Sequence, residues 1–261
     1  MNIVGIIPAR MASTRFPGKP LAKICGIPMV GHVYLRSRIC KSLNRVYVAT
    51  CDEEIFRYVE SIGGKAIMTS AAYERASDRT AAAMLKIEKE TREKIDIAVM
   101  IQGDEPMLYP VMIEKSIEPM IKDLSLEIVN LMAPLKSREE QDDPNQVKVV
   151  VDLNSFSLYF SRESIPSWKK GAKNVPMYKQ VPIIPFRRDF LLKFNALAQA
   201  TLEIAESVDM LRVLEHGYKV KMVPVDFGTY SVDTPEDLKK VEGLMKNDPL
   251  VGSYRDIGGK G

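Results

Sequence analysis

Short apolar runs alternate with helix-like segments through the first part of this chain. The apolar runs cover residues 3–7, 45–50, 65–69 and 95–101. Helical patterns occupy 29–38, 52–61 and a segment that starts at Ser77, the expected N-cap, and ends near residue 90. Nearly continuous apolar strands separated by helices are typical of a parallel sheet covered on both faces. The sequence therefore predicts an α/β fold of the Rossmann-like, doubly wound kind with a mainly parallel sheet.

The second half of the chain has a different pattern. Strand-like segments lie at 127–132, 147–152, 157–160, 181–186 and 220–225, a helical pattern covers 201–215, and 167–175 reads as a polar loop. Pro182 and Pro185 place the fourth of these strands at an edge or a bulge. Consecutive strands predict a smaller antiparallel subdomain embedded in the fold. Because no linker or repeat divides the chain, we expect one domain over 1–261, with a nucleotide-binding half at about 1–110 and an acceptor-binding half at about 111–245.

The loop after the first strand carries several positive charges. Arg10, Arg15 and Lys19 lie within it, together with the hydroxyl of Ser13 and with Gly18. Ligands of α/β proteins bind at the carboxyl ends of the strands, and arginine and lysine suit a polyphosphate. The spacing matches neither a P-loop nor a dinucleotide fingerprint. A polyphosphate site is favoured over the alternative, a solvated basic loop, because proline and glycine fix the shape of this segment.

Two acidic residues stand where a strand or loop meets this same edge. Asp104 follows the fourth strand and Gly103, and Asp233 precedes a helix that should begin with Thr234 as N-cap and Pro235 in the first turn. Magnesium keeps several waters and takes only one or two protein carboxylates, so this pair suits it. The alternative is that both residues only cap turns.

Five segments complete a resemblance to a known family. The chain resembles the sugar-activating nucleotidyltransferases, and within them the 3-deoxy-manno-octulosonate cytidylyltransferase family, from residue 3 to about 243. The resemblance rests on the loop described above, Gln102–Pro106, Asn145 with 147–150, 158–166, 211–217 and 232–238. It implies a nucleotide-diphospho-sugar transferase-like fold, a homodimer, and transfer of CMP from CTP to the anomeric hydroxyl of an acidic 2-keto-3-deoxy sugar, for surface polysaccharide biosynthesis.

The resemblance also implies roles for individual residues. Lys19, Arg10, Asp104 and Asp233 would be catalytic, and Asp104 and Asp233 would hold Mg²⁺. CTP would lie against Pro8, Ala9, Arg10, Ser13, Arg15, Lys19, Ser77, Gln102 and Asp104. The acceptor would be bound by Arg79, Arg162, Gln180 and Asp209.

The acceptor side departs from the family pattern. Gln180, Ile184 and Met210 stand where the family has a histidine, a tyrosine and a glutamine, and Arg75 and Ala76 replace a serine and a glycine. Lost polar groups suggest an altered acceptor, such as a nonulosonic acid, an amino-modified octulosonate or a phosphonate, because a buried polar pocket discriminates strongly. Neutral drift with the same sugar is the alternative. A non-catalytic nucleotide-binding homologue is a third possibility, which the retained Lys19 and both aspartates disfavour.

Charge and composition exclude other classes of function. A net charge of +3 is too small to indicate nucleic-acid or membrane binding. The three cysteines lack metal-ligand spacing, so we expect them to be reduced and at least half-buried. The chain has neither a signal-peptide pattern at its N-terminus nor a run of about 18 apolar residues, so we expect a cytoplasmic protein without membrane or nucleic-acid partners.

Overall fold

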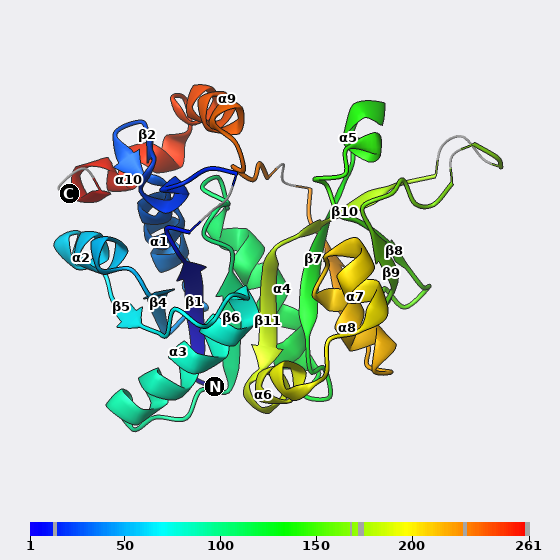
Figure 1. Cartoon of the computed structure of the whole chain (residues 1–261), viewed down its shortest axis with the longest axis horizontal. Coiled ribbons are helices and arrows are strands. Elements are labelled where there is room, and N and C mark those ends of the chain that lie inside the picture. Colours follow the sequence, from blue (N-terminus) through cyan, green and yellow to red (C-terminus); the bar gives the residue numbers. More distant parts are fainter. Residues whose placement is uncertain (13–14, 168, 172–174, 227–228, 259–261) are drawn as a thin grey trace. The chain divides into compact units, whose positions relative to one another are not determined.

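The computed structural model describes residues 1–12, 15–167, 169–171, 175–226 and 229–258. The chain forms two compact units, which are described separately. The first unit comprises Met1–Glu114 with Thr229–Gly261, and the second comprises Lys115–Gly228 (Figure 1). Among the described residues, no helix has both the length and the apolar character needed to cross a membrane.

A parallel sheet forms the centre of the first unit. Its strands are β1 (Ile3–Ala9), β4 (Arg45–Thr50), β5 (Ala66–Met68) and β6 (Ile97–Ile101), in the order β6-β1-β4-β5. All pairings among these strands are parallel, with Val4 opposite Arg45 and Ile3 opposite Ile97. Every residue of β1 is buried, as expected for a central strand. The predicted α/β fold with a parallel sheet is confirmed.

Helices of the first unit come from both ends of the chain. Three helices contact the sheet: α1 (Met29–Ile39), α2 (Glu53–Ser61) and α3 (Ala76–Thr91) (Figure 1). The unit also contains the short helix η1 (Lys19–Leu21) and the short strands β2 (Lys23–Ile24) and β3 (Ile27–Pro28). Two further helices, α9 (Pro235–Met245) and α10 (Pro249–Gly258), come from the C-terminal part of the chain. Thr234 caps α9 as predicted. Its hydroxyl oxygen accepts a hydrogen bond from the Asp237 N–H, and the Asp237 carboxylate accepts one from the Thr234 N–H. The expected N-cap of α3 is wrong. Arg75 has the extended backbone of the cap, and Ser77 lies buried in the first turn.

The second unit contains a mainly antiparallel sheet. Its strands are β7 (Val129–Pro134), β8 (Lys148–Val151), β9 (Ser157–Ser161), β10 (Tyr178–Val181) and β12 (Lys221–Pro224), in the order β12-β7-β10-β8-β9. Only β12 with β7 is a parallel pair, and the β8–β9 hairpin is present as predicted. The side chain of Asp152 shapes that hairpin by accepting from the backbone N–H groups of Asn154 and Phe156.

Two predicted elements of the second half are divided in the structure. The strand expected at 181–186 is two strands, β10 and β11 (Ile183–Arg187), which meet at Pro182. The helix expected at 201–215 is α7 (Thr201–Glu206) followed by α8 (Met210–Glu215), separated at Ser207, whose φ is 52°. Four further helices were not predicted: α4 (Pro110–Lys122), which spans the boundary between the units, α5 (Arg138–Asp142), α6 (Arg188–Ala196) and α10.

Candidate active site

A cavity of about 330 Å³ opens in the first unit at the carboxyl ends of β1 and β6. This is the edge where α/β sheets bind ligands. Its lining comes from the end of β1, the following loop, the starts of α1 and α3, the segment after β6, and Asp233. The ends of β1 and β6 approach closely here, since a Cβ on Gly103 would lie only 3.1 Å from the Pro8 carbonyl oxygen.

The loop after β1 folds back on itself and presents Lys19 to the cavity. Gly18 has a φ of 73°, a left-handed conformation that suits glycine. Its N–H donates to the Met11 carbonyl at 3.3 Å, and the Lys19 N–H donates to the Phe16 carbonyl at 3.1 Å. Asp52 accepts from the Met11 N–H at 2.8 Å and so ties the loop to the end of β4. Lys19 therefore occupies a defined position at the start of η1.

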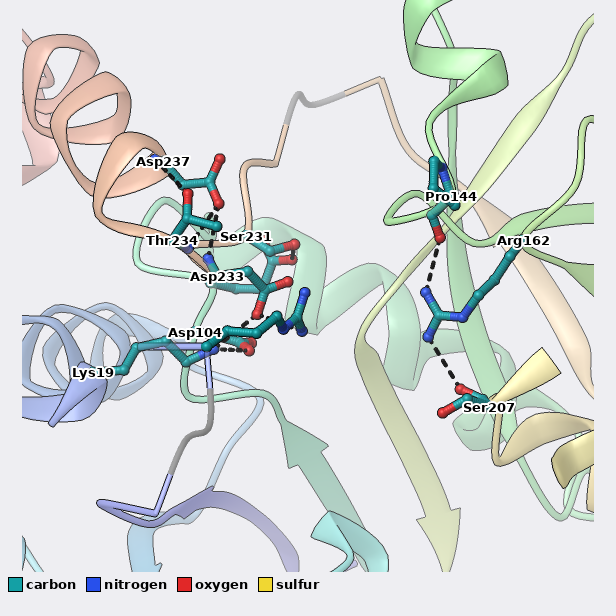
Figure 2. A network of polar contacts seen from close by, with 11 residues as sticks. Lys19, Asp104, Pro144, Arg162, Ser207, Ser231, Asp233, Thr234 and Asp237 are labelled. Carbon is teal, nitrogen blue, oxygen red and sulfur yellow. Dashed lines mark hydrogen bonds and ion pairs between the residues drawn. The ribbon is translucent and has the colours of Figure 1, made fainter. Parts of the chain in front are cut away.

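Lys19 bridges the two predicted carboxylates (Figure 2). Its Nζ lies 2.9 Å from Asp104 Oδ2 and 3.0 Å from Asp233 Oδ1. Arg15 adds a second cation, with Nη2 3.1 Å from Asp233 Oδ1. Burial by itself lowers the pKa of Lys19, but the charges of Asp104 and Asp233 and the hydrogen bonds to them outweigh it and raise the pKa above its ordinary value. The ammonium is therefore protonated throughout the physiological range.

Hydrogen bonds between residues 104–105 and residues 231–232 bring Asp233 close to Asp104. The Val232 N–H donates to the Asp104 carbonyl at 3.0 Å, and the Ser231 hydroxyl donates to Glu105 Oε1 at 2.9 Å. From the other side, the N–H of Asp233 donates to Asp237 Oδ2 in the first turn of α9 at 3.1 Å (Figure 2). Glu105 and Ser231 were not singled out from the sequence. Their only signal is that each stands within two residues of a predicted carboxylate.

Most residues predicted to bind the nucleotide share this cavity. Its lining includes Pro8, Ala9, Arg10, Arg15, Lys19, Gln102 and Asp104. Ser77 is fully buried at the start of α3 and does not belong to the described lining, and Ser13 lies outside the described residues. Sequence reasoning missed Ala12, Pro20, Met29, Glu74 and Ala76, and it gave Arg75 no role toward the nucleotide, although all six line the cavity.

The predicted acceptor residues have mainly structural partners. Arg79 lines the cavity but is only 2% exposed. Its guanidinium donates to Thr69 Oγ1 at 2.5 Å and to the Tyr73 carbonyl at 2.7 Å. Arg79 thus braces the segment between β5 and α3.

Arg162 in the second unit also acts as a brace. Its Nε donates to the Glu206 carbonyl at 2.7 Å. Its Nη1 donates to the Pro144 carbonyl at 2.9 Å and its Nη2 to the Ser207 carbonyl at 3.2 Å (Figure 2). Two of these bonds connect the end of β9 to Glu206, the last residue of α7, and to Ser207. Ser207 stands two residues before Asp209, which is the N-cap of α8.

The residues that depart from the family pattern differ in exposure. Gln180 is half-buried on β10, opposite Met132 of β7. Ile184 and Met210 are 3% and 1% exposed, within the core of the second unit. Of these three side chains, only Gln180 is not buried.

The carboxylate pair fits a divalent cation. Asp104 and Asp233 lie close enough to share one ammonium, which shows that both can face a single positive centre. Among the described residues, no group of three or more His, Cys, Asp or Glu side chains could hold a metal ion. A cation at this pair would therefore draw its remaining ligands from water and from a bound phosphate, as Mg²⁺ does.

The chain is similar to known cytidylyltransferases over nearly its whole length. Residues 4–222 match the family model described as cytidylyltransferase. A 3-deoxy-manno-octulosonate cytidylyltransferase of Geotalea uraniireducens (strain Rf4) is 42% identical over 256 residues, which cover 94% of this chain and 100% of that protein. An 8-amino-3,8-dideoxy-manno-octulosonate cytidylyltransferase of Shewanella amazonensis (strain ATCC BAA-1098 / SB2B) is 39% identical over 249 residues, covering 95% and 100%.

A solved structure is also similar to the chain over nearly its whole length. It is that of CMP:2-keto-3-deoxy-manno-octonic acid synthetase complexed with CTP, with a TM-score of 0.87 and 37% identity. The match covers 95% of this chain and 100% of the other.

Proposed function

This chain belongs to the cytidylyltransferase family, and we propose that it uses CTP with Mg²⁺ to transfer CMP to the anomeric hydroxyl of 3-deoxy-manno-octulosonate, releasing pyrophosphate. The observation that carries the proposal is the cavity in which Lys19 and Arg15 meet the carboxylates of Asp104 and Asp233. The CTP bound in the similar solved structure supports the choice of nucleotide.

The proposed roles rest on the family resemblance, and the shared cavity supports those of the described residues. Pro8 and Ala9 at the end of β1, with Gln102, receive the base and sugar of CTP, and the phosphates lie along Arg10, Arg15 and Lys19. The role of Ser13 toward the phosphates rests on the resemblance alone. The anomeric oxygen forms a bond to the α-phosphorus and its hydroxyl proton passes to water. The bond from that phosphorus to the bridging oxygen breaks, and its electron pair leaves with pyrophosphate. Such a displacement needs positioning and charge neutralisation more than covalent help from the protein.

The metal would be held by Asp104 and Asp233. When bound, Mg²⁺ supplies neutralisation of phosphate charge and polarisation of the phosphoryl oxygens. Lys19 is placed to pass from the carboxylates to a phosphate when a cation enters, because its ammonium is charged and its flexible stem can turn.

Neither histidine is placed to act as a base in the cavity. His32 is fully buried, with Nε2 2.8 Å from the Ile24 carbonyl oxygen and Nδ1 3.0 Å from the Tyr254 hydroxyl. His216 Nε2 lies 3.0 Å from the Ala198 carbonyl oxygen in the second unit. We therefore assign the catalytic contribution of this chain to its cations and carboxylates.

A second acceptor, the 8-amino-8-deoxy form of the same sugar, is the nearest competitor. The relative that bears this substrate in its name is 39% identical, against 42% for the octulosonate enzyme, so overall similarity separates the two only slightly. Gln180, which is half-buried, is a departure that could favour it. The acceptor-binding roles of Arg79, Arg162, Gln180 and Asp209 remain predictions.

Pyrophosphate release tests the proposal directly. The protein is given CTP, UTP, ATP or GTP with Mg²⁺ and, in turn, octulosonate, its 8-amino analogue, a nonulosonic acid and a phosphonate. We expect release only with CTP, strongest with octulosonate, and its loss in EDTA with recovery on adding Mg²⁺. Equal turnover of UTP, full activity in chelator, or a preference for another acceptor would refute the corresponding part.

We further propose that the enzyme acts as a cytoplasmic homodimer without nucleic-acid or membrane partners. The support is its use of CTP and the family resemblance. Light scattering after size-exclusion chromatography should give twice the mass of one chain, and cell fractionation should place the protein with the cytoplasmic fraction.

A further inference from the structure

The two carboxylates of the cavity reach each other from distant parts of the sequence. Asp104 follows β6, whereas Asp233 precedes α9. While Lys19 lies between them, its ammonium balances both charges. When that ammonium turns to a phosphate, the carboxylates repel each other until a metal replaces it. Their spacing must then be maintained by the chain itself.

Two hydrogen bonds join the segments that carry these carboxylates. They pair residues 104 and 105 with residues 232 and 231 in antiparallel order. The backbone bond from Val232 to Asp104 sets the distance between the segments. The side-chain bond from Ser231 to Glu105 lies next to the backbone bond, one residue before Val232 and one residue after Asp104. This second point of attachment sets the rotation of the segment before Asp233.

Glu105 is an unusual residue to find at this position. It is only 2% exposed, although glutamate is rarely buried without a partner. Ser231, in contrast, is exposed and can be changed with little effect on packing. A buried carboxylate thus accepts a hydrogen bond from the exposed hydroxyl of Ser231, which stands two residues before Asp233.

We propose that the Glu105–Ser231 hydrogen bond positions Asp233 opposite Asp104 for binding a divalent cation, so that Glu105 and Ser231 are positioning residues. This inference rests on the proposed function, because that function supplies the metal. Groups that hold metal ligands in place typically change metal affinity by about 10–100-fold when removed. On the α9 side, the capping box of Thr234 and Asp237 provides the second support.

Binding of Mn²⁺, followed through the electron paramagnetic resonance of the free ion, tests this role apart from turnover. Titrations are made on the whole protein with and without CTP. Ser231→Ala should raise the dissociation constant of Mn²⁺ by about tenfold. Ser231→Thr retains the hydroxyl and should restore tight binding. Ser253→Ala is the matched control, since it removes a hydroxyl that donates to the Leu250 carbonyl on α10, and it should have no effect.

Glu105→Gln separates hydrogen bonding from charge. Its amide oxygen can still accept from Ser231, so Mn²⁺ affinity should stay near that of the unmodified protein. Unchanged affinity in Ser231→Ala would overturn the proposal, as would an equal loss in Ser231→Thr. A larger loss in Glu105→Gln than in Ser231→Ala would assign the effect to the charge of Glu105 and would also overturn it. Failure of the unmodified protein to turn over CTP would refute the proposed function and leave the Mn²⁺ comparison standing.

Discussion

Lys19 in the first unit and Arg162 in the second differ in the groups to which they donate hydrogen bonds. In the first unit, Lys19 is bonded to two carboxylates on the wall of a cavity. In the second unit, Arg162 donates to three backbone carbonyls, and the buried Lys148 donates to the carbonyls of Asp143 and Arg162. A carboxylate can exchange an ammonium for a metal ion, whereas a carbonyl that loses a buried donor is left unsatisfied. The carboxylate partners of Lys19 therefore suit ligand binding, whereas the carbonyl partners of Arg162 and Lys148 stabilise the fold.

The hydrogen-bond partners of an arginine at a motif position give a criterion for its role that is independent of the motif. Arg79 lies in the first unit and lines the cavity, yet its guanidinium is bonded to Thr69 and the Tyr73 carbonyl in the same way that Arg162 is bonded in the second unit. The partners of an arginine therefore indicate its role better than its place in a conserved-looking segment.

The largest expected effect is on Lys19, which the comparison assigns to the ligand. Lys19→Ala should lower kcat by roughly 10²–10³, the range for one electrostatic stabiliser of the transition state. Steady-state kinetics at saturating CTP and acceptor measure it, with the exposed Lys23 on the nearby strand β2 changed to alanine as the control. A kcat within twofold of the unmodified protein would instead indicate that Lys19 has a structural role, as Arg162 does.

Metal dependence sharpens the comparison further. Asp104→Asn and Asp233→Asn should each raise the Mg²⁺ concentration for half-maximal rate by about 10–100-fold, at least as much as loss of an outer-shell group does. Their melting temperatures should stay near that of the unmodified protein, because both side chains are partly exposed and support no core. Asp142→Asn, which removes a carboxylate from the exposed pair with Arg138, is the control. A normal rate at low Mg²⁺ in either variant would remove that residue from the metal site.

The second unit should respond in stability rather than in nucleotide use. Arg162→Ala removes bonds to three carbonyls and should lower the free energy of unfolding by about 2 kcal/mol, with the KM for CTP unchanged. Urea denaturation followed by circular dichroism measures it. Arg138→Ala, which breaks the exposed i,i+4 ion pair with Asp142, should change stability by less than about 0.5 kcal/mol. Unaltered stability with a large rise in the KM for the acceptor would make Arg162 a binding residue and break the comparison.

The first unit also contains a polar network that serves only the fold, and acid should reveal it. Burial, the largest cause, and the nearby charge of Arg36 together lower the pKa of His32 to about 4, against the opposing effects of the Ile24 carbonyl and Asp248. Tyr254 completes the network through bonds to His32 and Arg36.

The sign of the pH effect follows from that lowered pKa. The unfolded chain takes up the proton near pH 6.5, before the folded chain does, so stability present above this pH is lost as the pH falls toward 4. Between pH 7 and 5.5 the free energy of unfolding should fall by about 1 kcal/mol from this group. Urea midpoints across this range measure it, and the decrease should vanish in His32→Gln. The same slope in that variant would assign the effect to other groups.

The first unit was largely predictable because its signals are local. The apolar runs defined β1, β4 and β6, and Pro17 and Gly18 marked the loop that carries Lys19. Asp104 could be placed at the ligand-binding edge because it follows a strand of the parallel sheet, whereas its pairing with Asp233 came from the family resemblance. What the sequence could not show is the bond between Glu105 and Ser231, since it joins residues that are distant in the chain.

The second unit was predicted less well because its decisive features are long-range or lack a residue signal. Ser207 has a positive φ without being glycine, so the break between α7 and α8 had no marker. Ile184 and Met210 were expected to face an acceptor, but packing within the unit buries both. The three carbonyl partners of Arg162 come from segments that a linear pattern cannot bring together.

A crystal structure with CTP and Mn²⁺, using the anomalous scattering of manganese, tests the central claim most directly. The account predicts a manganese peak between Asp104 and Asp233, with Lys19 turned toward the triphosphate and Arg162 still bonded to its three carbonyls. A manganese peak away from both aspartates, or a triphosphate bound outside the cavity of the first unit, would contradict it.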